Sequence, residues 1–324
     1  MERSVVRPAQ QVRYREMVQT FTDWTVALGL PTATLAELDH AVVAYFHDLF
    51  FNGEVVDRAS ALLAALVFCD PRVTRRTPEL PRARRALKGF GKLAPSRARL
   101  PLPWTVVALI ITKLLALGLT EAAWMTLLNF VFYCRPSELL RLRCRDLVAP
   151  PRGGPAALRK WSLLLNPIEG GVPSKTAVFD ESLLHDSVEF AWVNQVLEVI
   201  KSRRGPDDPI VGLTYAQWCG QFQQAVNALP LSALAPISLY QLRHGGASHE
   251  ILGGGRDTTG VKKRGRWQSD ASLHRYVKAG RLNEQLQRLD VPVQEAAAEC
   301  AERLSSVILA PSRACSLLQR KGLH

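Results

Sequence analysis

Three short segments combine arginine or lysine with tyrosine in a pattern that suits chemistry on a phosphate. They are residues 133–140 (YCRPSELL), 237–247 (ISLYQLRHGGA) and 263–276 (KRGRWQSDASLHRY). A phosphodiester undergoing transfer carries negative charge on its equatorial oxygens, and preorganised cations stabilise that charge. A tyrosine, with a free pKa of about 10, becomes a useful nucleophile where nearby positive charge favours its phenolate form. If the fold brings these segments together, they predict phosphoryl transfer.

Arg135 lies at a predicted break in helical structure. Proline disfavours the right-handed helical conformation for the residue before it, and Pro136 follows Arg135 directly. The helical pattern resumes at Glu138. The side chain of Arg135 is therefore expected to be free to leave the helix surface.

The three segments resemble the catalytic box of the tyrosine recombinase/integrase superfamily in their order and approximate spacing. The resemblance covers roughly residues 100 to 285. It implies that Arg135 and Arg243 clamp the nonbridging oxygens of a scissile DNA phosphate through paired guanidinium hydrogen bonds. It also implies that Tyr276 is the nucleophile and forms a 3′-phosphotyrosine intermediate.

Three further positions take their roles from the same resemblance. Lys175 matches the lysine of the family's β-hairpin, which implies that it protonates the departing 5′ oxygen. Trp267 takes the position that holds His or Trp in the family, and it would support the phosphate through its indole N–H. Glu138 matches the acidic position that orients the arginines.

Tyr240 departs from the family pattern. It stands three residues before Arg243, where the family usually has His. A phenol donates a hydrogen bond but is a much weaker base than imidazole at neutral pH, so removal of the Tyr276 proton is less well explained. His244 follows Arg243 directly, and adjacent residues on a helix diverge by about 100 degrees. We therefore expect His244 to pack elsewhere.

The charge of the chain favours a polyanionic partner. Lys and Arg number 41 against 29 Asp and Glu, which gives a formal net charge of +12. Residues 72–99 hold ten basic residues, a single acid and three prolines, a composition typical of a basic hinge that contacts phosphates. The residues predicted to contact DNA are Arg75, Arg76, Arg82, Arg84, Arg85, Lys88, Lys92, Lys262, Lys263, Arg264 and Arg266.

Other classes of site find no support in the sequence. No phosphate-binding glycine loop is present, and His249-Glu250 lacks the second histidine of a zinc protease helix because position 253 is Gly. We therefore expect neither a metal nor another cofactor. The six cysteines form no C-x-x-C pair, which favours a reducing intracellular compartment. The N-terminus shows no apolar leader, and the apolar stretch 100–134 is interrupted by charges, which predicts buried helices rather than a membrane span.

Helical periodicity dominates the chain. A stripe of apolar residues predicts a helix around residues 14–28, and the capping box of Thr34 and Glu37 begins a second one that ends near Gly53. A third is expected over 58–69. Further helices are expected over 100–133, up to 201, and over 215–229, 239–252 and 295–309, with Ser269 and Asp270 capping the one that carries Tyr276. Residues 161–166 and 176–179 read as a small β-hairpin.

The sequence thus predicts a mainly α protein with a small β-hairpin or sheet. Residues 1–99 form a helical domain, resembling the family's core-binding domain, whose hinge is 72–99. Residues 100–290 form an α+β catalytic domain, and 291–324 form a helical tail that packs either on a neighbouring protomer or on its own chain.

The expected function is metal- and ATP-independent recombination or integration of double-stranded DNA by a homo-tetramer assembled on DNA, with a monomer in solution as an option. Two alternatives stay open: a type IB topoisomerase that nicks strands, and an inactive, domesticated DNA-binding protein. The expected location is DNA-associated, in the nucleus of a eukaryote or in the cytoplasm and nucleoid of a prokaryote.

Overall fold

The chain forms two compact units that are mainly helical. The computed structural model describes residues 6–74, 79–94, 100–153, 155, 159–171, 178–234, 236–267 and 279–323. One unit comprises Met1–Ala98 and the other Arg99–His324. The described residues form helices and one small antiparallel sheet. This confirms the predicted fold class, mainly α with a small sheet.

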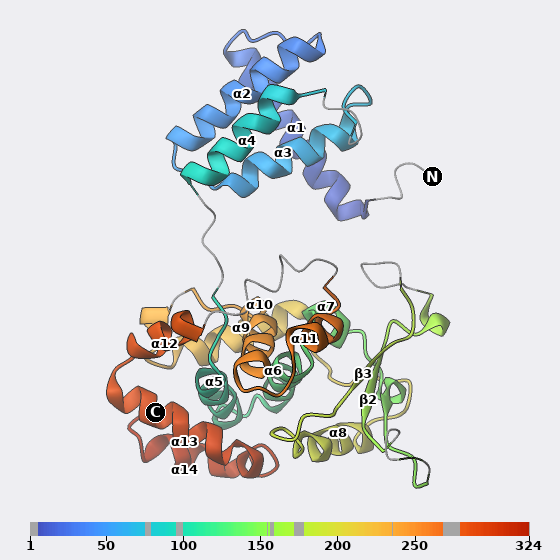
Figure 1. The fold of residues 1–324 in the computed structure, drawn as a ribbon, viewed down its shortest axis with the longest axis vertical. Helices are drawn as coiled ribbons and strands as arrows, with labels where there is room; N and C mark the ends of the chain where they lie inside the picture. The colour runs from blue at the N-terminus through green and yellow to red at the C-terminus, as the bar shows by residue number, and fades with distance from the viewer. Residues whose placement is uncertain are drawn as a thin grey trace. The chain divides into compact units, whose positions relative to one another are not determined.

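Over its described residues, the N-terminal unit is built from four helices (Figure 1). These are α1 (Pro8–Ala27), α2 (Leu35–Phe51), α3 (Val56–Cys69) and α4 (Pro81–Leu93). Their apolar faces meet in one cluster, in which Phe21, Phe46 and Leu62 are almost completely buried. The predicted capping box is confirmed, because the hydroxyl of Thr34 accepts from the N–H of Glu37 and the Glu37 carboxylate accepts from the N–H of Thr34. Gly53 adopts the left-handed conformation expected just past the end of α2.

Helix α4 corrects the prediction of an irregular basic hinge over residues 72–99. Pro81 stands in the first turn of α4, where its missing N–H costs nothing and its fixed φ favours the helix. The buried carboxylate of Asp39 accepts hydrogen bonds from the backbone N–H groups of Arg82 and Ala83, at 3.0 and 2.8 Å. Phe90 anchors the same helix in the core. Much of the expected hinge is therefore an integral part of the N-terminal unit.

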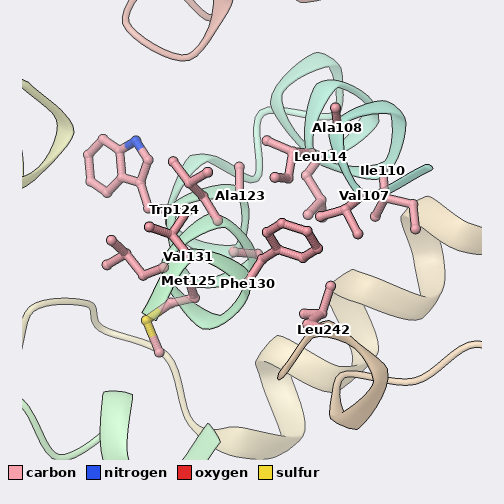
Figure 2. Close-up of a cluster of buried hydrophobic side chains, with 14 of the residues drawn as sticks. Val107, Ala108, Ile110, Leu114, Ala123, Trp124, Met125, Phe130, Val131 and Leu242 are labelled. Carbon is pink, nitrogen blue, oxygen red and sulfur yellow. The ribbon is translucent and has the colours of Figure 1, made fainter. Parts of the chain in front are cut away.

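The C-terminal unit has a core of three helices. They are α5 (Trp104–Ala116), α6 (Thr120–Phe132) and α10 (Tyr240–Leu252), and Figure 2 shows how their apolar side chains interlock. Nearly every residue of α5 and α6 is buried, which confirms that the apolar stretch forms interior helices. Among the described residues, no helix combines the length and apolar character needed to cross a membrane.

The remaining helices of this unit cover the core. Helices α13 (Val291–Val307) and α14 (Ser312–Gln319) lie against α5 (Figure 1). Leu304 and Ile308, which lie in the segment 295–309 predicted to be helical, are buried in the same core as α5. These two residues therefore pack on their own chain, and contact of the tail with a neighbouring protomer stays a prediction. The other helices are α7 (Pro136–Leu139), α8 (Val193–Ser202), α9 (Tyr215–Asn227), α11 (Thr258–Gly265) and α12 (Ala279–Gln287).

The sheet has three short antiparallel strands in the order β1-β2-β3. They are β1 (Leu147–Val148), β2 (Ser162–Leu165) and β3 (Glu181–Leu184), and Leu163 pairs with Leu183 in the middle of the sheet. The strand β2 matches the prediction. Its observed partner begins at Glu181, after a turn at Asp180, which has a positive φ. Of the predicted run 176–179, residues 178 and 179 are not strand, and residues 176 and 177 lie outside the described residues. Lys175 lies outside the described residues.

Candidate functional site

The segment that carries Arg135 is a sharp break between α6 and α7, as predicted. Tyr133 ends α6 in the left-handed conformation, and Arg135 is extended with φ −73 and ψ 144. Pro136 then begins α7. The break turns both the backbone and the side chain of Arg135 toward Glu138, whose carboxylate accepts from the backbone N–H at 2.7 Å and from Nη1 at 2.5 Å.

Glu138 is the centre of the site. Its side chain is only 6 % exposed, and three guanidinium groups surround it. Arg266 Nη2 lies 2.5 Å and Arg243 Nη1 lies 3.9 Å from Glu138 Oε2, while Arg135 binds mainly the other oxygen. Arg266 also lies 3.7 Å from the carboxylate of Glu181 at the start of β3. Three guanidinium groups thus face two carboxylates, and the cluster keeps an excess of positive charge.

Arg243 is the most deeply buried of the three arginines. Its side chain is 3 % exposed, and it donates hydrogen bonds to the carbonyl of Tyr133, at 2.6 Å, and to that of Gly265. Burial, with smaller contributions from Arg266 and Arg135, lowers the pKa of Arg243 to about 10. The side chain therefore stays cationic at neutral pH, and it has donors beyond the two that bind carbonyls.

Two glycines let Arg243 reach this position. A Cβ on Gly245 would clash with the carbonyl of Leu102, and a Cβ on Gly246 would clash with the carbonyl of Phe130 at the end of α6. Helix α10 therefore packs backbone to backbone against α6. This close approach places Arg243, one turn earlier, against the end of α6 where Arg135 follows.

We expect Gly246→Ala to destabilise the C-terminal unit strongly. An added methyl group would meet backbone that cannot move without displacing α6, so the free energy of unfolding should fall by about 3 kcal/mol, at the upper end of overpacking effects. Urea denaturation measures this change. Gly220→Ala in α9 is the matched control: its Cβ would meet open space, and the better helix former should raise stability by about 0.5–1 kcal/mol. Equal stability of Gly246→Ala and the wild type would refute the close-packing argument.

Trp267 lies directly beside Arg243. The Arg243 guanidinium carbon is 5.0 Å from the centre of the indole ring, which is a cation–π distance. The ring also covers Gly265 so closely that any side chain there would overlap it. Trp267 thus stacks on an arginine of the cluster. Its predicted indole contact with phosphate stays a prediction.

Tyr240 stands at the first turn of α10, and its side chain is half-exposed. Its ring packs edge-on against His244, with 4.6 Å between ring centres. His244 is buried, which confirms the expectation that it packs. Its direction relative to the arginines stays a prediction. The role of Tyr240 at the usual His position stays a prediction. Tyr276 lies outside the described residues, as does the helix predicted to carry it.

Cys134, between Tyr133 and Arg135, carries a buried thiol that is kept protonated. It is completely buried, and burial raises the pKa of its thiol to about 11. All six cysteines of the chain are unpaired. The described residues also contain no group of three or more His, Cys, Asp or Glu that could hold a metal ion.

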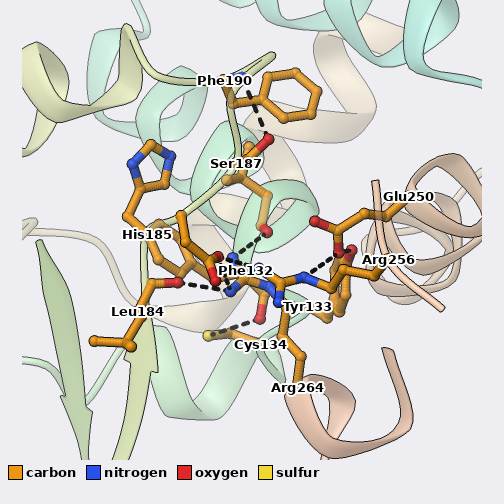
Figure 3. Close-up of polar contacts among 12 residues, drawn as sticks. Phe132, Tyr133, Cys134, Leu184, His185, Ser187, Phe190, Glu250, Arg256 and Arg264 are labelled. Carbon is orange, nitrogen blue, oxygen red and sulfur yellow. Dashed lines mark hydrogen bonds and ion pairs between the residues drawn. The ribbon is translucent and has the colours of Figure 1, made fainter. Parts of the chain in front are cut away.

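Arg264 is corrected from a DNA contact to a structural residue (Figure 3). Its side chain is 5 % exposed and donates to the carbonyls of Leu184 and Val131, at 2.6 and 3.1 Å. It also pairs with Asp186 at 3.3 Å. Arg264 therefore ties α11 to the sheet and to the end of α6. Lys263 is exposed and Lys262 is half-buried. For these two residues, DNA contact stays a prediction.

Arg266 is also corrected, because it faces the interior. Its side chain is 8 % exposed and its charge is directed at Glu138 and Glu181. The sequence reasoning missed this inward role, as it missed Glu181, because charge spacing says nothing about burial. One signal was available in the sequence: Arg266 stands at the end of a helix, where glycine is usual, and such a position can indicate a special role.

The basic residues of α4 lie mainly on its surface. Arg82, Arg85, Lys88 and Lys92 are exposed, and the last three recur at helical spacing along one face. Arg84 is half-buried and donates to the carbonyl of Thr74 at 3.3 Å. The exposed stripe of Arg85, Lys88 and Lys92 fits a phosphate backbone. Arg75 and Arg76 lie outside the described residues.

No family model and no curated protein matches this chain.

Proposed function

We propose that this protein breaks and rejoins double-stranded DNA through a covalent tyrosine–phosphate intermediate. The observation that carries the proposal is the cluster around Glu138, where Arg135, Arg243 and Arg266 meet from segments far apart in the sequence. An excess of positive charge in a partly buried site suits a phosphodiester better than a neutral or cationic substrate.

The arginine pair is assigned to the scissile phosphate. Arg135 is about one-quarter exposed, so its guanidinium group is accessible from solvent, while Arg243 is fixed from behind by two carbonyls and by Trp267. A fixed cation stabilises developing charge without reorganising during the reaction. The two residues would thus bind the nonbridging oxygens as the phosphate becomes five-coordinate.

The covalent step is assigned to Tyr276 and Lys175. The oxygen of Tyr276 forms a bond to phosphorus as the bond to the 5′ oxygen breaks, which leaves a 3′-phosphotyrosine. Lys175 donates a proton to the departing 5′ oxygen, and the proton of the Tyr276 phenol passes to solvent, since Tyr240 is a poor base at neutral pH. Rejoining reverses these steps, so the bond energy is conserved and no nucleotide is consumed.

DNA binding is assigned to the exposed stripe of α4 and to Lys262 and Lys263. Cationic side chains along a helix bind phosphates without reading sequence, and their contribution weakens with added salt. We propose that four copies assemble on DNA. Leu304 and Ile308 are not available to that assembly, because they are already packed in their own chain.

A second candidate function is DNA binding without cleavage. Tyr240 favours it, because a phenol in the usual position of a histidine makes a poor base. The cluster around Glu138 would then hold an intact phosphate.

A trapping experiment distinguishes these functions. The wild-type protein is incubated with a nicked duplex from which the cleaved strand end diffuses away, and covalent protein–DNA adducts are separated on a denaturing gel. We expect adducts with the wild type and none with Tyr276→Phe, which lacks only the attacking oxygen. DNA binding without any adduct would select the second function. Relaxation of supercoiled DNA at many sites would identify a topoisomerase.

A further inference from the structure

Helix α11 ends in an arrangement that normally requires glycine. The N–H of Arg266 bonds to the carbonyl of Lys263, and the N–H of Trp267 bonds to the carbonyl of Lys262, both at 3.1 Å. These two hydrogen bonds form a Schellman motif, in which the residue just past the helix end adopts the left-handed backbone conformation. That residue is Arg266, with φ 53 and ψ 43. An L-residue with a long side chain is disfavoured in this conformation.

The Arg266 side chain is also costly to place. Only 8 % of the side chain is exposed. Among the described residues, its Nη1 and Nε have no hydrogen-bond partner. Buried donors without partners oppose folding. Both the backbone conformation and the buried side chain of Arg266 therefore oppose folding. The strong interaction that offsets these costs is the ion pair with Glu138.

The ion pair with Arg266 determines how closely the Glu138 carboxylate can approach Arg243. Glu138 Oε2 lies 2.5 Å from Arg266 Nη2 and 3.9 Å from Arg243 Nη1, so Arg266 occupies the oxygen that Arg243 would otherwise bind. Arg243 binds backbone carbonyls instead, and its charge is not cancelled by a direct carboxylate contact. The same oxygen holds the backbone N–H of Arg135 at 2.7 Å.

We propose that Arg266 is a positioning residue of the phosphate site: it occupies Glu138 Oε2 and so keeps the charge of Arg243 available to the phosphate. This inference rests on the proposed function. Arg266 acts through Glu138 and does not contact the substrate, because its guanidinium group is enclosed. Its left-handed backbone also fixes the carbonyl of Gly265, which accepts from Arg243.

The test compares Arg266→Gly and Arg266→Lys with the wild type. Glycine relieves the backbone conformation while removing the guanidinium group, and lysine keeps a charge without the planar fork. We expect Arg266→Gly to fold, because Glu138 keeps Arg135 and Arg243 as cationic neighbours, and to leave the affinity for intact duplex within about twofold. Its rate of adduct formation at saturating DNA should fall by roughly 10- to 100-fold, as expected when reacting groups are displaced slightly. Added methylguanidinium should restore part of the rate, and Arg266→Lys should be intermediate.

Each other outcome counts against the inference. Wild-type rates in Arg266→Gly at saturating DNA would overturn it while leaving the proposed function intact. A loss of folding in both variants would show that Arg266 is structural only, and so would a lower rate that methylguanidinium does not raise. If the wild type itself forms no adduct, the proposed function fails first and this inference fails with it.

Discussion

Arg243→Ala should lower the rate of adduct formation at saturating DNA by about 10²–10³-fold, the usual effect of removing one preorganised donor from a developing oxyanion. Arg243 is held by the carbonyls of Tyr133 and Gly265 and by the face of Trp267, so its charge is fixed before the substrate binds. No flexible surface cation can replace it. Single-turnover gel assays on a nicked duplex measure the rate.

Two controls make the Arg243 result specific. Arg243→Lys keeps the positive charge but loses the planar fork, and we expect a smaller loss of rate than for alanine. Arg303→Ala removes a surface arginine that pairs with Glu299 one turn earlier, and it should react like the wild type. If Arg243→Ala folds, binds DNA and reacts at the wild-type rate, Arg243 does not bind the scissile phosphate.

Glu138→Gln should lower the free energy of unfolding by about 3–5 kcal/mol, because removing one partner of a buried ion pair leaves its charge uncompensated. Here the consequence is enlarged, since three guanidinium groups would then face one another with only the more distant Glu181 to offset them. Glutamine preserves the shape of the side chain, so the loss reports charge rather than packing. Urea denaturation of the full chain provides the measurement.

Glu284 supplies a matched control for Glu138. Its carboxylate also binds two arginines, Arg281 at 2.6 Å and Arg288 at 2.5 Å, but this group lies on the surface. Water screens such pairs and each side chain pays for being ordered, so Glu284→Gln should have far less effect than Glu138→Gln. Equal effects of the two substitutions would show that burial of the arginine cluster contributes little to stability.

Local signals in the sequence were sufficient for much of the fold. The capping box at Thr34 and the glycine at residue 53 set the ends of α2 through contacts within a few residues, and both were predictable. The break at Arg135 was predictable for the same reason, because Pro136 constrains its immediate neighbour.

Features that depend on distant residues were not predictable. Prolines near α4 indicated irregular structure, yet Pro81 begins a helix whose first N–H groups are bound by Asp39, more than forty residues earlier. The partner of β2 was placed too early, because the turn at Asp180 decides where the second strand begins. For α4 the deciding contact is absent from the local sequence, whereas Asp180 stands directly before its strand, and its positive φ is not evident from the residue type alone.

The candidate site shows the same division. The sequence indicated Arg135, Arg243, Glu138 and Trp267, and these four lie in one cluster. It also assigned Arg264 and Arg266 to DNA because they belong to a basic run, but both are buried. A basic run records charge, whereas the direction of each side chain depends on how α11 meets the sheet and α6.

The most direct test of the account is to identify the residue that becomes attached to DNA. The trapped adduct is digested with protease and nuclease, and the modified peptide is sequenced by mass spectrometry. We predict that a nucleotide is linked through a 3′ phosphate to the oxygen of Tyr276, and to no other residue. Attachment to a different side chain, or a 5′ linkage, would contradict the proposed arrangement of two arginines and a phenol around one phosphate.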